Sequence, residues 1–255
     1  MNQLKNYNMK LSVVIPAYNE AENLEKTIKE YHHTLCENNI KHEIIVINDN
    51  SKDGTLLLLD KLKEKISTLE VYTNTGPNGY GYAVQKGLNN FKGDCVAIVM
   101  ADLSDDPDDL VKYFNTLNKY DCDMVFGSRW IKGAKVINYP KNKLWLNRFI
   151  NHCIRFLFCF KYNDVTNGFK LFKKETIEGL KPFLSGQFSF ALELPLKAII
   201  RGYSYKVVPN NWYNREIGES NLKVRKMAFR YLFIIFYCLN ERFFSMGDYK
   251  KNKLL

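Results

Sequence analysis

The 255-residue sequence predicts an α/β protein whose mostly parallel sheet is flanked by helices. Short apolar runs rich in β-formers alternate with amphipathic helical stretches from the start, which is the rhythm of βαβ units. Polar and acidic clusters follow these runs directly, and in open α/β sheets the carboxyl ends of the strands bind ligands. With 46% apolar and 25% charged residues, the chain is long enough to bury a sizeable core.

Five apolar runs have the length and composition of buried strands. They are Leu11–Ile15, Glu43–Ile47, Leu69–Tyr72, Cys95–Met100 and Met124–Phe126. Because amphipathic stretches separate them, we expect each strand to be followed by a crossover helix and to lie parallel to its neighbours.

Two helices have defined starts. Asn19 is placed to cap the first helix, with Glu22 three residues later. Asp106 followed by Pro107 is a cap and first-turn pair for another helix. Apolar residues then keep helical spacing in the first helix at Leu24, Ile28, Tyr31 and Leu35.

The pattern changes from about Lys141, where two long aromatic and basic segments replace the strand–helix alternation. Leu144–Phe160 and Met227–Phe244 both have helical period, and Lys223, Arg225, Lys226 and Arg230 border the second. Such segments suit helices that lie in a bilayer interface, although burial in the core is the alternative. We therefore predict a tail (1–9), a catalytic domain (10–222) that includes an interfacial helix (143–160), and a C-terminal amphipathic basic helix with its tail (223–255).

A formal charge of +10 and an isoelectric point near 9.1 require a negatively charged partner. Nucleic acid, an anionic membrane and a phosphorylated substrate all meet that requirement. No nucleic-acid-binding motif accompanies the charge, so we expect no nucleic acid partner.

The six cysteines are scattered, without a C-x-x-C pair and without a Cys/His cluster at zinc-ligand spacing. We expect reduced, mostly buried thiols. The stretch up to Lys10 is polar and does not read as a signal peptide, and the apolar run Tyr231–Leu239 is far shorter than the roughly 20 residues of a spanning helix. These features predict a cytoplasmic protein, peripheral on the cytoplasmic face of a membrane.

The turns after the first two strands carry candidate nucleotide-binding residues. Pro16-Ala17-Tyr18-Asn19-Glu20 combines a proline with an aromatic side chain that can flank a flat base, and the polar turn Asn48–Thr55 contains Asp49, which can accept a hydrogen bond from a base N–H. Each alone is more typical of a plain turn. Together, at corresponding strand ends, they favour a nucleotide.

Two further segments contain candidate ligand-binding residues, of which the first is a weak signal and the second a stronger one. Gly79 and Gly81 let the backbone approach either a ligand or a neighbouring helix, but they lack the register of a dinucleotide fingerprint. Asp102 follows the most hydrophobic strand, where a carboxylate suits Mg²⁺ or Mn²⁺. The aspartates from Asp106 to Asp109 are better explained as charges at a helix start, an explanation that is also open for Asp105.

These motifs, in this order, resemble the family-2 glycosyltransferases with the GT-A fold, and most closely their dolichyl-phosphate mannose synthase-like branch. The resemblance runs from about Leu11 to Leu222. It rests on Pro16–Glu20, Asp49–Ser51 with Asp53–Thr55, Gly79–Gly87, Ala101–Ser104, Gly127–Arg129, Asp164–Lys170 and Arg215–Leu222.

The resemblance implies a role for each matching residue. The donor nucleotide would contact Pro16, Ala17, Tyr18, Glu20, Asp49, Gly79, Gly81, Ala101 and Asp102. Asp102, with Ser104 where the family often has glutamine, would hold Mg²⁺ or Mn²⁺. Asp102, Arg129 and Arg215 would be catalytic, the two arginines facing the phosphates. Two departures bear on metal and nucleotide binding, because Met100 and Asn48 stand where the family commonly has aspartate.

The chemical class of the acceptor can be considered from the groups that the reaction needs. A sugar hydroxyl needs a general base, whereas a phosphate monoester is already anionic and needs positioning and charge neutralisation. No histidine stands beside the motifs, which is compatible with a phosphate acceptor. Arg129 and Lys143 are its candidate cations, and Asn147 is a neutral donor.

We therefore expect inverting transfer of a sugar from GDP-mannose or a UDP-sugar to a polyprenyl phosphate at a membrane surface, with a membrane-anchoring protein as a further candidate partner. Gly127-Ser128-Arg129 followed by Lys132-Gly133 leans towards mannose by resemblance. Two alternatives stay open. One is transfer to a soluble glycan or protein hydroxyl, with Asp105 or Asp164 as base, and the other is a nucleotide-sugar-binding module without catalysis.

Overall fold

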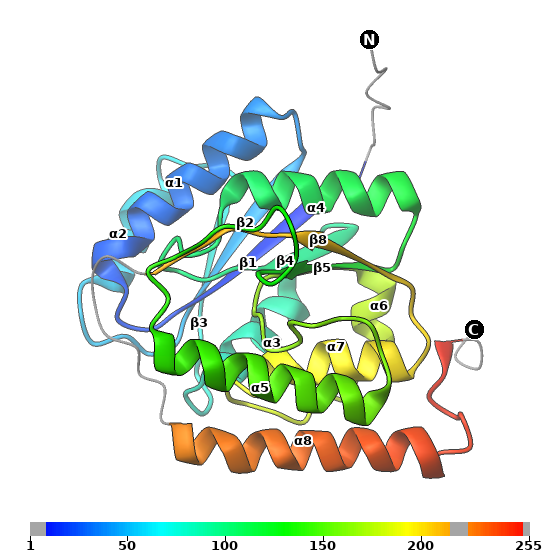
Figure 1. The fold of residues 1–255 in the computed structure, drawn as a ribbon. Coiled ribbons are helices and arrows are strands. Elements are labelled where there is room, and N and C mark those ends of the chain that lie inside the picture. The colour runs from blue at the N-terminus through cyan, green and yellow to red at the C-terminus, as the bar shows by residue number, and fades with distance from the viewer. Residues whose placement is uncertain (1–8, 215–223, 252–255) are drawn as a thin grey trace.

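A computed structural model describes residues 9–214 and 224–251 of the protein. Its centre is a seven-stranded sheet in the order β3-β2-β1-β4-β7-β5-β8 (Figure 1). The strands are β1 (Leu11–Ala17), β2 (His42–Asn48), β3 (Leu69–Thr73), β4 (Cys95–Ile98), β5 (Met124–Ser128), β7 (Lys170–Lys173) and β8 (Tyr205–Pro209). Only β7 runs antiparallel to its neighbours within this described sheet. The predicted mostly parallel sheet is therefore confirmed.

All five predicted runs form strands, although β4 ends at Ile98 and not at Met100. The sequence did not predict β7 and β8, nor the short parallel pair of β6 (Val136–Ile137) and β9 (Trp212–Tyr213). These strands are short, and β7 begins and ends with lysine, so their local pattern is weak.

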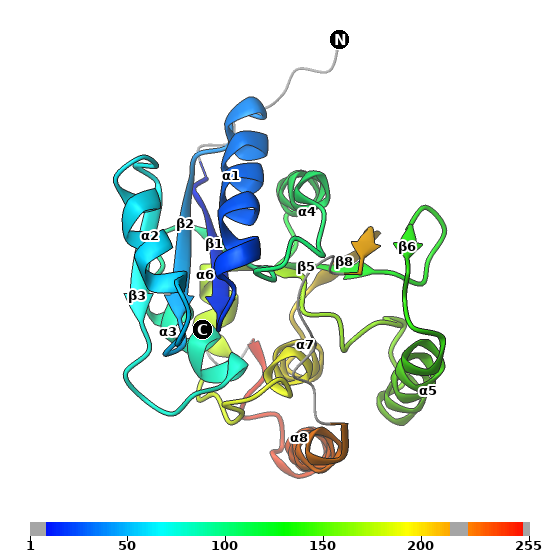
Figure 2. The same ribbon diagram turned by 90° about the vertical axis from the view of Figure 1, so that its left-hand side faces the viewer.

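Helices cover both faces of the sheet (Figures 1 and 2). They are α1 (Ala21–Glu37), α2 (Thr55–Lys63), α3 (Tyr80–Asn90), α4 (Pro107–Tyr120), α5 (Lys141–Phe158), α6 (Lys174–Gly179), α7 (Phe190–Ile200) and α8 (Val224–Phe244). Side chains of α1, α2 and α4 bury one face of the sheet, and those of α3, α6 and α7 bury the other.

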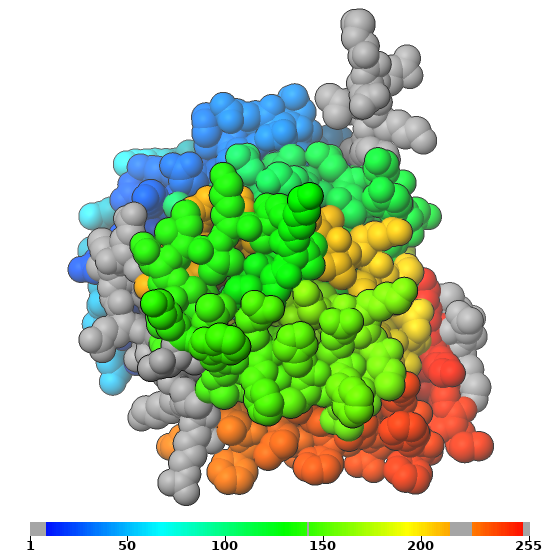
Figure 3. All heavy atoms as spheres, in the orientation of Figure 1, coloured from blue at the N-terminus to red at the C-terminus, as the bar shows by residue number. Residues whose placement is uncertain are grey.

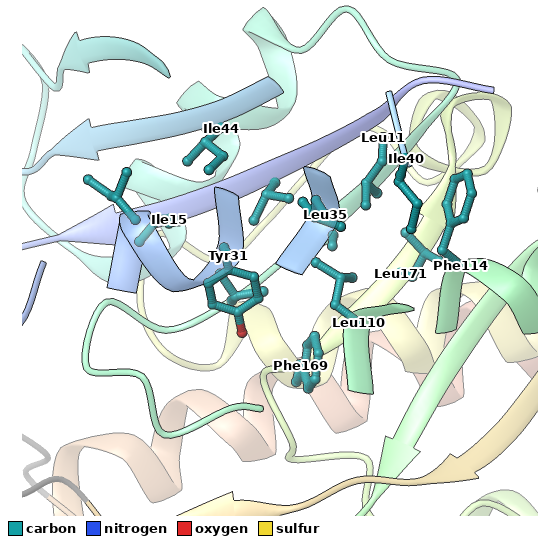
Figure 4. Packing of buried hydrophobic residues seen from close by; sticks show 14 of the residues in the cluster. Leu11, Ile15, Tyr31, Leu35, Ile40, Ile44, Leu110, Phe114, Phe169 and Leu171 are labelled. Atoms are coloured by element: carbon teal, nitrogen blue, oxygen red, sulfur yellow. The ribbon is translucent and has the colours of Figure 1, made fainter. Parts of the chain in front are cut away.

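The first of these cores confirms the predicted periodicity of α1. Leu24, Ile28, Tyr31 and Leu35 are all fully buried. Figure 4 shows Tyr31 and Leu35 directed from the helix towards the sheet and α4. Burial of this apolar stripe, at about 25 cal/mol per Å², holds the helix beside the turn that follows β1.

The two predicted helix starts have different outcomes. Asp106 caps α4 as predicted, because its side chain accepts a hydrogen bond from the Asp108 N–H and Pro107 begins the helix. The prediction that Asn19 caps α1 is wrong. Glu20 holds the cap position without a side-chain cap bond, and Asn19 adopts a left-handed φ of 55° outside the helix.

The aromatic segments form α5 and α8, with starts at Lys141 and Val224, and α5 ends two residues before the predicted limit. The two helices run along the lower edge in Figure 1 and are both seen end-on in Figure 2. The Arg242 guanidinium of α8 donates to the Phe158 carbonyl of α5, which ties their C-terminal ends together. The predicted domain boundary at residues 222 and 223 lies outside the described residues, and the domain division stays a prediction.

Both helices are amphipathic. One face of each is buried in the core, and the other face exposes aromatic side chains. Ile154 and Phe158 of α5 are buried in the core, whereas Trp145, Phe149 and Phe156 are 75%, 66% and 86% exposed. In α8 the exposed aromatic side chains are Phe229, Phe233, Phe236, Phe243 and Phe244. Side chains of α5 and α8 form adjoining parts of the surface in Figure 3. Among the described residues, no helix is both long and apolar enough to cross a membrane.

The cysteines are all free, as predicted, but only Cys95, Cys122 and Cys238 are buried. The expectation that most of the six are buried is therefore wrong. The sequence has no Cys/His cluster at zinc-ligand spacing, but the fold brings one together. Cys36 lies beside His32 and His42 at the amino end of β2. Sequence spacing hid this cluster because a turn brings the start of the strand back to the helix.

Candidate active site

The turns after β1 and β2, residues 18–20 and 49–55, are joined by hydrogen bonds, and we call them the paired turns. The parallel register places Ala17 beside Asn48, so both strands end at the same edge. The Asn19 N–H donates to the Ser51 hydroxyl at 3.0 Å, and the Lys52 N–H donates to the Asn19 side-chain oxygen at 2.8 Å. The structure thus brings together the two segments that the sequence predicted to bind a nucleotide.

Asp49 is buried at the base of the paired turns, and both of its carboxylate oxygens are engaged. The Asn74 side-chain amide donates to one oxygen at 2.6 Å, and the Gly79 N–H donates to the other at 2.7 Å. Asp49 therefore fixes the segment that precedes α3. Each oxygen has a second lone pair, so its contact with a base stays a prediction. Tyr18 is 40% exposed at the rim.

The predicted glycines approach the chain itself. A side chain on Gly81 would collide with the backbone of Ser185 and Gln187, and one on Gly79 would collide with Gly186 and Gln187. Of the two roles that the sequence left open, close packing is the one the structure displays. Donor contact by Gly79 and Gly81 stays a prediction.

The turn after β4 directs two predicted residues into one cavity. The Ala101 carbonyl accepts from the Thr27 hydroxyl at 2.8 Å, which anchors the turn to α1. Leu103 has a left-handed φ of 54° and packs on the core, a backbone state that is uncommon for a leucine. The Ser104 N–H donates to Asp102 at 3.2 Å, and both side chains line the cavity. The left-handed turn at Leu103 therefore belongs to the segment that directs the Asp102 and Ser104 side chains into the cavity.

The cavity has a volume of about 410 Å³. It unites five predicted residues from four separate segments: Asp102, Ser104, Arg129, Lys143 and Asn147. Thr166, Asn167, Gly168 and Phe188 also line it. Arg215, the remaining predicted catalytic residue, lies outside the described residues.

Arg129 is held rigidly at the cavity wall by Asp164. Its Nε and Nη2 atoms donate to the two carboxylate oxygens at 2.8 and 2.7 Å, and its backbone N–H donates to the same carboxylate at 3.0 Å. Burial alone would lower the pKa of Arg129, but the charge and hydrogen bonds of Asp164 raise it above its usual range. The guanidinium therefore stays charged and oriented.

Asn147 joins α5 to the loop that carries Asp164. Its side-chain amide donates to the Thr166 hydroxyl at 2.9 Å, and its oxygen accepts from Asn151 at 3.0 Å. Lys143 is exposed one turn earlier on the same helix. Two of the three acceptor-side candidates, Lys143 and Asn147, therefore lie on one helix, and Arg129 follows β5.

Asp105 is a buried carboxylate in the cavity wall. Its Oδ2 atom has no hydrogen-bond partner among the residues that the structure describes. Burial, and then repulsion by Asp102, raise the pKa of Asp105 to about 7, against the attraction of Arg129. The sequence presented Asp105 only as a helix-start charge or an alternative base. Its distance of three residues from Asp102 was the available signal.

Lys170 of β7 is a second buried ionisable group near the cavity wall. Its Nζ atom has no hydrogen-bond partner within the described part of the chain. Burial lowers the pKa of Lys170 to about 7, although Asp164 acts in the opposite direction. The electrostatic field near the cavity is therefore set by the ion pair of Asp164 and Arg129 together with two buried ionisable groups, Asp105 and Lys170.

Three aromatic cavity residues were missed by the sequence analysis: Tyr139, Trp212 and Tyr231. Tyr139 and Trp212 pack with ring centroids 4.7 Å apart. The pairing of β6 with β9 brings them together across more than 70 residues, which local periodicity does not reveal. The proline that follows Tyr139, at the start of the aromatic segment, was the only local sign.

Several acidic residues have structural roles. Asp106 accepts from the Asn211 side-chain amide at 3.1 Å, and Asp109 accepts from the Asn211 N–H. Glu193 is buried, paired with Lys197 at 2.7 Å, and accepts from two backbone N–H groups of the preceding loop. These contacts agree with the interpretation of Asp106 and Asp109 as residues of a helix start.

The sheet order, the acidic turn after β4 and the charged cavity define the class of GT-A glycosyltransferases. The chain resembles the solved structure of glucosyl-3-phosphoglycerate synthase from Mycobacterium tuberculosis in complex with Mn²⁺, UDP and glucosyl-3-phosphoglycerate, with a TM-score of 0.67 over 92% of this chain and 80% of that one. The sequence identity is 18%, so this likeness concerns the fold.

Residues 12–180 match the model of glycosyl transferase family 2, and the chain belongs to this family. It is 33% identical over 88% of its length to a dolichol-phosphate mannosyltransferase from Pyrococcus furiosus, of which it spans 62%. It is 31% identical over 86% of its length to a polyprenol monophosphomannose synthase from Mycolicibacterium smegmatis, of which it spans 84%. The resemblance inferred from the motifs is confirmed.

Proposed function

We propose that this protein transfers a sugar, with inversion, from a nucleotide sugar to a polyprenyl phosphate at a membrane surface. The observation that carries the proposal is the cavity that unites Asp102 and Ser104 with Arg129, Lys143 and Asn147. Asp102 and Ser104 carry oxygen atoms that suit a cation bound to the donor diphosphate, and the cationic Arg129 and Lys143 suit an anionic acceptor. The names of the two relatives, a dolichol-phosphate mannosyltransferase and a polyprenol monophosphomannose synthase, support GDP-mannose as the first donor to test and a polyprenyl phosphate as the acceptor.

The residues of the acidic turn fit a divalent cation. Asp102 and Asp105 line the same cavity with oxygen donors, the set that Mg²⁺ and Mn²⁺ prefer, and the Asp105 Oδ2 atom is buried without a partner in the described residues. Asp102 would hold the cation, with Ser104 and Asp105 beside it. When bound, a divalent cation neutralises charge on the departing nucleoside diphosphate.

The chain's own groups then position the acceptor. In the proposed step an oxygen of the acceptor phosphate attacks the anomeric carbon as the bond to the diphosphate breaks, which inverts the configuration. The phosphate needs no base, because it is anionic at neutral pH. Arg129, oriented by Asp164, and the exposed Lys143 supply its counter-charges, and Asn147 donates a hydrogen bond. Arg215 remains a predicted phosphate ligand.

The surface beside the cavity supports a lipid acceptor. Trp145 and Phe149 of α5 are exposed on the helix that carries Lys143 and Asn147, and α8 adds further exposed aromatic side chains. Arg148 and Arg155 are exposed among them. Aromatic and basic residues on one helix favour the headgroup region of an anionic bilayer. We further propose a location on the cytoplasmic face, consistent with six unpaired cysteines, and an anchoring protein as an additional partner.

A soluble hydroxyl acceptor is a second candidate, because one observation favours it. The pKa of Asp105 is raised to about 7 by burial and by Asp102, and its carboxyl group lines the cavity. A carboxylate with a pKa near neutrality is suited to remove a proton from a hydroxyl. A third reading, a binding module without catalysis, would leave the site unable to turn over.

The deciding experiment combines donor and acceptor panels. Purified full-chain protein is incubated with GDP-mannose or UDP-sugars, Mg²⁺ or Mn²⁺, and either dolichyl and undecaprenyl phosphates or soluble glycans. We expect a radiolabelled sugar to enter the lipid fraction with one donor preferred. Transfer only to soluble glycans would favour the second candidate. Nucleotide-sugar binding without transfer or hydrolysis would favour the binding module.

The membrane component has its own measurement. Vesicles of phosphatidylcholine, with and without anionic phosphatidylglycerol, are floated with the protein. The double variant Phe156→Ser/Phe236→Ser should lose most binding, because both side chains are more than 60% exposed. Leu57→Ser is the matched control, since Leu57 is 63% exposed on α2. Equal flotation of all three proteins would contradict the interfacial role.

A further inference from the structure

Three metal-binding side chains meet at the edge of the sheet opposite the cavity. His32 and Cys36 lie one turn apart on α1, and His42 is the first residue of β2. One ligand atom from each lies within 4.8 Å of the other two. Because β2 runs from His42 to Asn48, this cluster is separated from the Asp49 end by the length of the strand.

The His42 ring is already oriented as a ligand. Its Nδ1 atom lies 2.8 Å from the Ile40 carbonyl, and because a carbonyl only accepts, Nδ1 carries the proton. The lone pair of a neutral ring is then on Nε2, which lies 3.0 Å from His32 Nδ1. A backbone carbonyl that fixes the tautomer of a histidine is a typical outer contact of metal sites. The Thr68 hydroxyl lies 3.1 Å from His32 Nδ1 and has to turn away when that nitrogen binds a metal.

The separations are close to those of a tetrahedral site. With zinc–nitrogen bonds of about 2.0–2.1 Å and zinc–sulfur bonds of about 2.3 Å, tetrahedral angles place two nitrogens about 3.4 Å apart and nitrogen and sulfur about 3.6 Å apart. The observed separations are 3.0 Å between the two imidazole nitrogens and 3.9 Å between Cys36 Sγ and His32 Nδ1. These two separations therefore differ from the ideal by a few tenths of an ångström, and the third, between the Cys36 and His42 ligand atoms, is at most 4.8 Å.

We propose that His32, Cys36 and His42 bind one Zn²⁺ ion with two imidazole nitrogens and one thiolate. This donor set suits zinc and not the Mg²⁺ expected at the cavity, which requires oxygen ligands. Cys36 is exposed, so a water molecule can complete the tetrahedron. Binding releases the thiol proton of Cys36, and the proton on His32 Nδ1 moves to Nε2 of the same ring.

The ion would join the end of α1 to the start of β2 across the turn at residues 38–41. A ligand that binds only the folded chain stabilises it by mass action, so zinc should raise the melting temperature. Its place at the far edge predicts little effect on transfer. The site is therefore a structural or zinc-responsive element and no part of the proposed catalytic machinery.

The test uses metal-free full-chain protein in excess Mg²⁺, which occupies carboxylate sites. Co²⁺ should give a saturable thiolate charge-transfer absorption at one equivalent, and Zn²⁺ should displace it. Cys36→Ser should abolish the absorption, and His32→Asn should weaken Zn²⁺ binding on the order of tenfold or more. Matched controls are Cys159→Ser, another exposed thiol, and His33→Asn, whose ring pairs with Glu37 at 3.2 Å; both should bind like the parent.

Retention of the absorption in Cys36→Ser, or the absence of saturable binding at one equivalent, would overturn the proposal and leave an ordinary hydrogen-bonded histidine pair. Cys36 is exposed, so its serine variant should fold, and circular dichroism verifies this. Because the readout is metal binding and not transfer, the outcome is independent of the proposed function.

Discussion

The paired turns and the cavity differ in how their polar groups are satisfied. In the paired turns, Asp49 accepts two hydrogen bonds and Asn19 both donates and accepts across to the second turn. At the cavity, the Asp105 Oδ2 and Lys170 Nζ atoms are buried without a partner in the described residues. A fully bonded network rigidifies a structure, whereas an unpaired buried group is costly. The paired turns are therefore a rigid frame. A ligand bound in the cavity can instead supply hydrogen-bond partners that the described residues do not provide there.

The largest expected effect is on catalysis. Asp102→Asn keeps the shape of the turn but removes the charge that we assign to the cation site. Transfer should fall about 100-fold or more, because the charge of the leaving diphosphate is no longer neutralised. Initial rates at saturating Mn²⁺ measure this. Asp108→Asn, an exposed carboxylate two residues into α4, is the matched control and should keep full activity. Full metal-dependent transfer by the Asp102 variant would exclude the assignment.

The next effect is on stability at the cavity wall. Asp164→Asn leaves the buried Arg129 guanidinium without its counter-charge, which should lower the free energy of unfolding by about 3–5 kcal/mol. Urea unfolding measures the change. Asp121→Asn is the control, because Asp121 pairs with Lys173 at the surface with 90% of its side chain exposed, and exposed pairs contribute little. Similar losses in both variants would contradict the distinction between buried and exposed pairs.

A buried group near the cavity wall should destabilise the fold. Lys170→Met removes a buried amine without a partner in the described residues, and the free energy of unfolding at pH 7 should rise by about 1–3 kcal/mol. The folded pKa of about 7 lies below the unfolded value near 10.5. The folded state therefore binds fewer protons between these values, and the stability of the parent rises as pH increases from 7 to 9.

The methionine variant should lose that rise, which urea unfolding at several pH values measures. Glu43→Gln is not a suitable control, since Glu43 has its own hydrogen bonds to Lys10 and Ser12. Lys174→Met serves instead, as Lys174 is next to the end of the same strand but less buried. An unchanged pH dependence in Lys170→Met would show that Lys170 stays charged in the folded protein.

Local sequence patterns predicted the part of the fold that local physics determines. The continuous apolar run of β1 and the helical spacing of α1 both indicate burial, and the Asp106–Pro107 pair indicates a helix start. Strand ends of a parallel sheet share an edge, so Asp49 and Asp102 were both placed at the carboxyl edge of the sheet without coordinates. These inferences depend on neighbours within a few residues or on a general rule of topology.

The remaining features depend on distant pairing. Lys170 appears polar in the sequence, but β7 inserts between β4 and β5 and buries it. Tyr139 and Trp212 meet only because β6 pairs with β9. Asn19 resembles a cap, but its bond to the Lys52 N–H holds it in the left-handed conformation, and the cap position passes to Glu20. In each case a long-range contact overrides the local pattern.

The smallest expected effect concerns the paired turns. Asn19→Gly keeps access to the left-handed φ of 55° but removes the oxygen that accepts from the Lys52 N–H, which should cost about 0.5–1.5 kcal/mol in the free energy of unfolding. Asn19→Ala loses the same bond and adds the strain of a left-handed alanine, about 1 kcal/mol more. Urea unfolding separates the two terms, and the KM for the nucleotide sugar should rise in parallel. Equal stability of the glycine and alanine variants would mean that the turn relaxes out of the left-handed state, and the paired turns would then be less rigid than their hydrogen bonds indicate.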